Sequence, residues 1–191
     1  MNNIIRPAIG VFAGLTLITG VLYPLLTTGI AQGIFPHQAN GSLIVENGQR
    51  TGSELIGQSF TTPSYFWGRP SATGTAPYNG MASGGSNLSN ANPALLEAVQ
   101  ARIAELKKYP VPAGAVPVDL VTASASGLDP HISPAAALYQ LPRVAAARSI
   151  STEQLRALVA AHMETTAPRF AGEGRINVLA LNRALDKLTG S

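Results

Sequence analysis

The chain has 191 residues, of which 13 are basic and 10 acidic, so its formal net charge is +3, and it contains no cysteine. The lack of cysteine excludes disulfides, thiolate metal sites and a lipid-modified cysteine. Only 12% of the residues are charged, about half the usual share in soluble domains, and the scattered basic residues argue against a nucleic-acid-binding surface.

The first predicted element is a transmembrane helix over residues 7–31. No Asp, Glu, Lys or Arg occurs between Pro7 and Val45, and residues 8–30 are almost wholly apolar or small. About 20 such residues in a helix span the hydrocarbon core of a bilayer. This run exceeds the roughly 7–15 residues of a signal-peptide core, which favours a retained span over cleavage after Gly29-Ile30-Ala31. A buried helix of a soluble domain is a weaker alternative, because such helices usually alternate with charge.

Gly10 and Gly14 form a GxxxG spacing in this helix. Such a spacing lets a second membrane helix approach closely, and it also occurs simply because glycine is common in membrane helices. The GxxxG spacing is therefore explained equally well by contact with a partner helix and by the usual glycine content of membrane helices. Pro24 is expected to kink the helix unless a neighbour satisfies the freed carbonyl.

The charges that flank the helix predict its orientation. Arg6 and the amino terminus lie on one side, and on the other side no basic residue occurs before Arg50. The positive-inside rule therefore predicts a short cytoplasmic segment at residues 1–6 and a periplasmic domain at residues 32–191. The expected localisation is the bacterial inner membrane, crossed once, with about one domain's length of chain outside.

A hairpin and a long loop are expected next. Residues 42–46 and 49–53 flank Asn47-Gly48, the dipeptide that best fits a two-residue hairpin turn. From residue 57 to 92, Gly, Ser, Thr, Asn and Pro dominate, which predicts an extended loop. The residues expected to anchor this loop to a surface are Tyr65, Phe66, Trp67, Tyr78, Met81 and Leu88.

Four helices are predicted from their N-caps at Asn92, Ser133, Ser151 and Asn177. They should end before Pro110, near Arg148 with a disturbance at Pro142, before Pro168, and close to the C-terminus. The expected apolar faces comprise Leu96, Val99, Ile103 and Leu106; Leu155, Leu158 and Val159; and Val178, Leu181, Leu185 and Leu188. The β-rich run 118–122 predicts a buried strand. The fold class is therefore α+β: one N-terminal transmembrane helix, then a mixed domain with a small sheet and three to four helices.

Patterns for catalysis or metal binding are weak. No Gly precedes a Lys, which excludes a phosphate-binding P-loop. His37, His131 and His162 lie far apart without metal-ligand spacing, so no metal is predicted.

Ser124, Ser126, Asp129 and His131 supply the residue types of a hydrolase triad, but they lack a GxSxG motif and lie too close in sequence for triad geometry. A turn and helix cap is the better account. A membrane-tethered or secreted binding or serine hydrolase domain, using Ser124 or Ser126, remains the alternative function.

Several blocks, in order along the whole chain, form a more specific pattern. They are 23–27 (YPLLT), 38–43 (QANGSL), 55–60 (LIGQSF), 68–72 (GRPSA), 78–79 (YN), 82–88 (ASGGSNL), 120–129 (LVTASASGLD), 143–145 (RVA), 181–182 (LN) and 184–186 (ALD). Together they resemble the KdpC family, the single-span accessory subunit of the bacterial Kdp potassium-transporting P-type ATPase.

The resemblance implies a complex for high-affinity potassium uptake with three partner subunits. These are a channel-like potassium-translocating subunit (KdpA), an ATP-hydrolysing pump subunit (KdpB) and a small single-helix subunit (KdpF). This chain would be the non-catalytic subunit that assembles, stabilises and modulates them, while ATP and potassium are handled by the complex. The family is described as a catalytic chaperone that raises the pump's ATP affinity, and by resemblance to the ABC-transporter signature Ser83, Gly84 and Gly85 would be linked to nucleotide.

The charge argument places this loop outside the cytoplasm, whereas ATP is cytoplasmic. A periplasmic cap near the ion entrance is consistent with this location. Such a cap would change the pump's affinity for ATP only allosterically. The partner-contact candidates are Gly10, Gly14, Tyr65, Trp67, Arg69, Tyr78 and Asn87. Tyr65 and Trp67 are the preferred anchors, and Arg69 would alternatively pair with Glu54 or Glu97 inside the domain.

Overall fold

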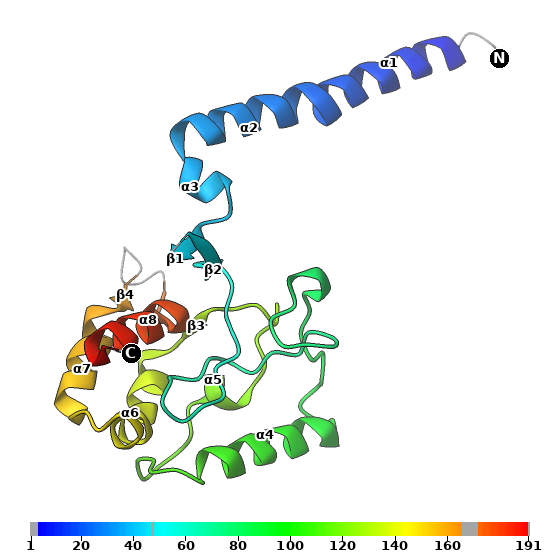
Figure 1. Cartoon of the computed structure of the whole chain (residues 1–191). Helices are drawn as coiled ribbons and strands as arrows, with labels where there is room; N and C mark the ends of the chain where they lie inside the picture. Colours follow the sequence, from blue (N-terminus) through cyan, green and yellow to red (C-terminus); the bar gives the residue numbers. More distant parts are fainter. Residues whose placement is uncertain (1–3, 47, 166–171, 191) are drawn as a thin grey trace. The chain divides into compact units, whose positions relative to one another are not determined.

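The computed structural model describes residues 4–46, 48–165 and 172–190. The chain divides into two compact units, Met1–Ser53 and Glu54–Ser191 (Figure 1). Asn47 of the predicted turn and Pro168, at which a helix was expected to stop, lie outside the described residues.

The first unit begins with one long apolar helix. It consists of α1 (Ile5–Leu17), a π-helical turn (Ile18–Leu22) and α2 (Tyr23–Ile34). Together they form a helix of 30 residues, Ile5–Ile34, that is long and apolar enough to cross a membrane, and none of it is buried within the described structure. At 1.5 Å per residue the helix is about 45 Å long.

The π-helical turn lies directly before Pro24, where the sequence predicts a kink. The Tyr23 amide donates to the Ile18 carbonyl, five residues back. The hydroxyls of Thr19 and Thr27 donate to the carbonyls of Leu15 (2.7 Å) and Tyr23 (2.9 Å). The helix continues through Pro24 by way of this π-helical turn, which is a common local adjustment at a proline in a membrane helix.

The predicted hairpin is confirmed. After the short helix α3 (Pro36–Ala39), strands β1 (Leu43–Glu46) and β2 (Gln49–Ser53) pair antiparallel, with a register shift next to Ile44. Gly48 has a φ of 77°, which suits glycine in a tight turn. Ile44 is buried, whereas its neighbours Leu43 and Val45 are exposed, so the side chains of β1 alternate between two faces.

The second unit is mainly helical. Between Glu54 and Asn92 the one element described is the 3₁₀ turn η2 (Gly80–Ala82). The helices are α4 (Pro93–Leu106), α5 (Val118–Val121), α6 (Pro134–Arg148), α7 (Thr152–Ala161) and α8 (Val178–Thr189). All four predicted N-caps are confirmed, since the side chains of Asn92, Ser133, Ser151 and Asn177 each accept a backbone N–H of the first turn.

A small sheet and a core of side chains complete this unit. Strands β3 (His131–Ile132), β4 (Met163–Glu164) and β5 (Arg175–Asn177) pair antiparallel in the order β3-β5-β4. Helices α6, α7 and α8 lie side by side (Figure 1). The buried apolar side chains of these helices and of β5 include Leu141, Val144, Leu155, Ile176, Leu181 and Leu185.

The strand predicted at 118–122 is wrong, because these residues form helix α5. Leu120 and Val121 are both buried while Val118 is 70% exposed, and two adjacent inward side chains fit a helical turn better than an alternating strand. Asp119 fixes the turn by accepting the Ser133 N–H at 2.6 Å and the Ser133 hydroxyl at 3.2 Å.

Three smaller expectations are also corrected. Leu96 and Leu188, assigned to buried helix faces, are 60% and 50% exposed, and Met81, expected to anchor the loop, is 98% exposed. Helix α6 runs as one element through Pro142.

Candidate functional site

Two buried amide side chains hold the loop at Phe66 and Trp67. Asn182 on α8 accepts the Phe66 N–H and donates to its carbonyl, both at 2.9 Å. Gln140 on α6 accepts the Trp67 N–H at 2.7 Å and donates to its carbonyl at 3.1 Å. Each amide therefore pairs with the backbone as a neighbouring strand would, which allows a loop without strands to cross the core.

Arg143 lies beneath the same segment. Its side chain is 1% exposed, and its guanidinium is 4.0 Å from the centre of the Trp67 ring. It donates to the carbonyls of Pro63 (2.8 Å) and Tyr65 (3.0 Å) and to Gln140 Oε1 (2.5 Å). Burial lowers the pKa of Arg143 to about 10. The charged guanidinium therefore fixes the loop by hydrogen bonds to the backbone carbonyls of Pro63 and Tyr65 and by a cation–π contact with the Trp67 ring.

Tyr65 is held by a second arginine. Arg148 lies 4.6 Å from the Tyr65 ring centre and forms an ion pair with Asp186 at 2.6 Å. The Tyr65 hydroxyl donates to the other Asp186 oxygen at 3.2 Å. The structure therefore places Tyr65 and Trp67, both half-buried, against helices α6 and α8 of their own domain.

Tyr78 packs against two glycines. A Cβ atom at Gly57 would lie 2.4 Å from the Tyr78 ring, and one at Gly68 would lie 2.7 Å from its hydroxyl oxygen. The hydroxyl donates to the Arg69 carbonyl at 2.6 Å. Burial raises the pKa of Tyr78 to about 12, the Asp129 carboxylate adds to the rise and Arg69 opposes it.

Arg69 does pair inside the domain, but with Asp129 rather than with Glu54 or Glu97. Its Nη1 is 3.4 Å from Asp129 Oδ2, and its Nη2 donates to the Ala123 carbonyl at 3.3 Å. The pKa of Asp129 lies below its ordinary value: burial raises it, but hydrogen bonds from His131 and the charge of Arg69 lower it further. Asp129 therefore stays ionised and fixes Arg69.

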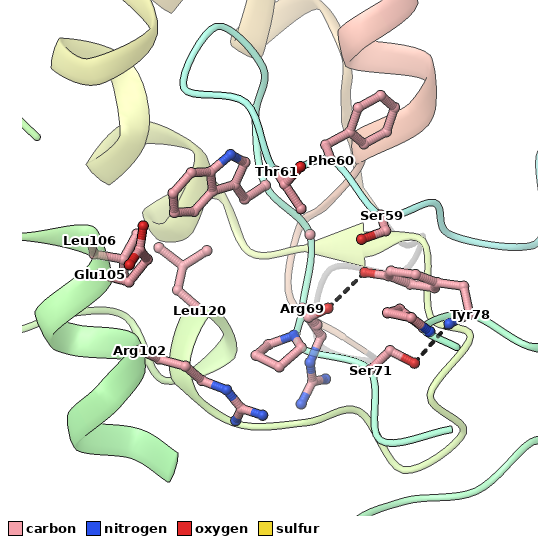
Figure 2. Close-up of a pocket in the computed structure, with 14 residues that line it drawn as sticks. Ser59, Phe60, Thr61, Arg69, Ser71, Tyr78, Arg102, Glu105, Leu106 and Leu120 are labelled. Atoms are coloured by element: carbon pink, nitrogen blue, oxygen red, sulfur yellow. Dashed lines mark hydrogen bonds between the residues drawn. The ribbon is translucent and has the colours of Figure 1, made fainter. Parts of the chain in front are cut away.

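A pocket of about 450 Å³ opens between the loop, α4 and α5 (Figure 2). The loop contributes Trp67, Arg69 and Tyr78, helix α4 contributes Arg102, Glu105 and Leu106, and α5 contributes Leu120. Three of the predicted partner-contact residues thus meet in one concave site. Asn87 is exposed with a positive φ of 53° and does not line it.

Ser83, Gly84 and Gly85 lie against the turn at residues 124–127. The Ser83 hydroxyl and the Gly84 N–H both donate to the Ser126 carbonyl, at 3.0 and 2.9 Å. A Cβ atom at Gly85 would lie 3.0 Å from the Ala125 carbonyl oxygen. Gly85 therefore permits close packing of the two loops, whereas a Cβ atom at Gly84 would lie 4.0 Å from its nearest neighbour.

The serines and His131 do not form a triad. The ring nitrogens of His131 are 3.4 Å from Asp129 and 3.9 Å from Glu164, and the Ser126 hydroxyl accepts the Leu128 N–H at 3.1 Å. Asp129 also accepts the His131 N–H at 3.0 Å, a local turn. Within the described part of the chain, no group of three or more His, Cys, Asp or Glu could hold a metal ion.

Gly10 and Gly14 lie on α1, and a Cβ atom at either position would meet no other atom within 4 Å. Space for a second helix is therefore available on this face.

Arg102, Gln140, Arg143, Arg148 and Asn182 are the site residues that the sequence did not reveal as such. A signal for Arg102 exists: it lies three residues after Val99 and four before Leu106 on an otherwise apolar helix face. An arginine at such a position has to find partners in a partly buried place.

The sequence of the chain matches a known protein family over most of its length. The family described as "KdpC: K+-transporting ATPase, c chain" matches residues 5–187. Relatives named "Potassium-transporting ATPase KdpC subunit" include one from Polaromonas naphthalenivorans, 61% identical over 189 residues, covering 98% of this chain and 96% of the relative. Another, from Variovorax paradoxus, is 59% identical over 187 residues, 97% of each chain. A third, from Erwinia tasmaniensis, is 57% identical over 185 residues, 96% of this chain and 97% of the relative.

Proposed function

The chain belongs to the KdpC family, and we propose that it is the accessory C subunit of a potassium-transporting ATPase complex. The observation that carries this proposal is the match over residues 5–187, which includes the apolar helix and all but the last four residues of the second unit. A match limited to the helix would support only a membrane anchor. The proposed partners are a channel-like, an ATP-hydrolysing and a small single-helix subunit.

The helix Ile5–Ile34 is proposed to be a retained, single span of the inner membrane. Its flanking charges support a cytoplasmic N-terminus, because Arg6 precedes it and the next basic residue is Arg50. Residues 32–191 would then lie in the periplasm, with the loop of residues 57–92 among them. Gly10 and Gly14 would contact a helix of another subunit.

In this topology the second unit acts as a periplasmic cap near the ion entrance and stabilises the assembled complex. ATP lies on the other side of the membrane, so an effect on the pump's ATP affinity would arise from different contacts with two pump states. The bonds from Ser83 and Gly84 to Ser126 favour a structural role for this segment.

Assembly is tested by co-expressing the chain with the other subunits and purifying through a tag on the ATP-hydrolysing subunit. The wild-type chain should co-purify, and its deletion should abolish growth at limiting potassium. Gly10→Val with Gly14→Val should reduce recovery without a clash inside the chain, since both positions are open. Ala8→Val adds the same kind of bulk about 120–160° around the helix from the two glycines and should not reduce recovery. Failure of the wild-type chain to co-purify would refute the proposal.

Topology is tested with a single cysteine, since the chain has none of its own. Met81→Cys replaces a side chain that is 98% exposed, so a membrane-impermeant thiol reagent should label it in spheroplasts. Ile4→Cys, on the other side of the helix, should react only in permeabilised cells. The reverse pattern would place the domain in the cytoplasm and exclude a periplasmic cap.

A further inference from the structure

Arg102 carries a positive charge that its own chain leaves without a carboxylate partner in the described residues. It is half-buried on α4, and Nη1 donates to the Val121 carbonyl at 2.7 Å. Among the described residues it forms no ion pair. Burial lowers the pKa of Arg102, with no opposing contribution from an acidic neighbour. A cation held partly out of water without an anion is unfavourable.

Arg69 contributes a second guanidinium to the pocket that Arg102 lines. Arg69 and Arg102 are held by the carbonyls of Ala123 and Val121, two residues apart, and both line the pocket (Figure 2). Asp129 offsets the charge of Arg69, and Glu105, the acidic residue in the lining, is paired with Lys108. One positive charge, that of Arg102, is left over.

The rest of the pocket is mainly apolar, although Ser59, Thr61 and Ser71 add hydroxyl groups to its lining. Trp67, Leu106 and Leu120 form one wall, and Pro70 and Pro77 belong to the loop side. A volume of about 450 Å³ suits a few side chains rather than an extended ligand. Trp, Tyr and Arg around a concave apolar surface are the residues that carry most energy in protein interfaces.

We propose that this pocket receives an acidic side chain of another subunit, whose carboxylate pairs with Arg102 while a neighbouring apolar side chain packs against Trp67 and Leu120. The proposal rests on the proposed function and deepens it by naming a residue and the partner's chemistry. Arg102 and Arg69 together provide planar donors suited to a carboxylate. The pocket would thus be a specific contact of the C subunit.

A zero-length cross-link tests the carboxylate directly. Arg102→Lys places an amine in the pocket, and a water-soluble carbodiimide then joins that amine to a carboxylate in contact with it. In the assembled complex we expect an amide between position 102 and an Asp or Glu of another subunit, identified by mass spectrometry. Arg156→Lys, exposed on α7, should give no such product. Coupling only to Glu105, or none in an intact complex, would overturn the proposal.

Charge reversal provides the second test. Arg102→Glu should weaken association with the other subunits by about 30-fold or more, whereas Arg156→Glu makes the same charge change on the exposed face of α7 and should leave it unchanged. Trp67 fluorescence and circular dichroism verify that both variants fold. Equal association of both variants would refute the pocket contact but not the proposed function. This would also be the outcome if a small organic acid, and not another subunit, filled the pocket. If the wild-type chain does not associate with the other subunits, both the pocket contact and the proposed function are refuted.

Discussion

The two amide side chains that hold the loop allow a quantitative prediction. Asn182→Ala removes both hydrogen bonds to Phe66, whose side chain is fully buried. The Phe66 N–H and carbonyl then have no partner in the core, at a cost of about 1–3 kcal/mol each. Alanine is more favourable in a helix than asparagine by roughly 0.6 kcal/mol. The free energy of unfolding should therefore fall by about 1.5–5 kcal/mol.

The assay is urea unfolding of the full chain in detergent, followed by tryptophan fluorescence. Trp67 is the one tryptophan in the chain and is bonded directly to Phe66, so the signal reports on this segment. With a denaturant slope of about 2 kcal/mol per M, the midpoint should fall by about 0.75–2.5 M. Asn90→Ala, which removes the same amide from an exposed turn, should shift it by less than about 0.3 M. If Asn182→Ala lowers the free energy of unfolding by less than about 1 kcal/mol, water or relaxation replaces the lost bonds. That result would contradict the conclusion that Asn182 holds the loop at Phe66.

Three further outcomes follow from other contacts. Gly57→Ala should destabilise the domain by about 1–3 kcal/mol in the same assay, because its Cβ would lie 2.4 Å from the Tyr78 ring, whereas Gly74→Ala, 3.7 Å from its nearest neighbour, should be neutral or slightly stabilising. Ultraviolet titration should show one tyrosine with a pKa of about 12 that Tyr78→Phe abolishes; because the folded pKa is raised, the stabilisation from Tyr78 is complete below about pH 10 and is lost as the pH rises through 12. Ser151→Ala removes the capping box of α7 and should lower the free energy of unfolding by about 1 kcal/mol, measured by the same urea titration.

The helices could be predicted from the sequence because their signals are local. Asn92, Ser133, Ser151 and Asn177 each cap a helix through a bond to a residue two or three positions away. The strands β3, β4 and β5 could not, since segments of two or three residues are too short to show alternation. For α5, β-branched composition suggested a strand, but the side-chain bonds between Asp119 and Ser133 and the burial of two adjacent residues decide otherwise.

The candidate site was predictable only in part. Trp67, Arg69 and Tyr78 stood out as rare residue types in a polar loop, and the structure brings them to one pocket. Arg69 pairs with Asp129, 60 positions away, and Trp67 bonds Gln140, 73 positions away, and no local pattern encodes such pairings. The intramolecular partner of Arg69 was therefore predicted wrongly.

The long loop has no strand partner in the described residues, and besides isolated backbone bonds such as that from the Gly84 N–H to the Ser126 carbonyl, side chains supply hydrogen bonds to its backbone. Ser71 donates to the Gly127 carbonyl at 2.7 Å and accepts the Tyr78 N–H at 2.9 Å, and Thr73 donates to the Ala76 carbonyl at 2.7 Å. Several polar residues of the family-like blocks are therefore used to build the loop. A polar group engaged in this way has less to offer a partner, because a new bond must replace an existing one. Arg102 lies outside those blocks and keeps its charge uncompensated, which is why the strongest prediction of a partner contact falls on a residue that the resemblance did not mark.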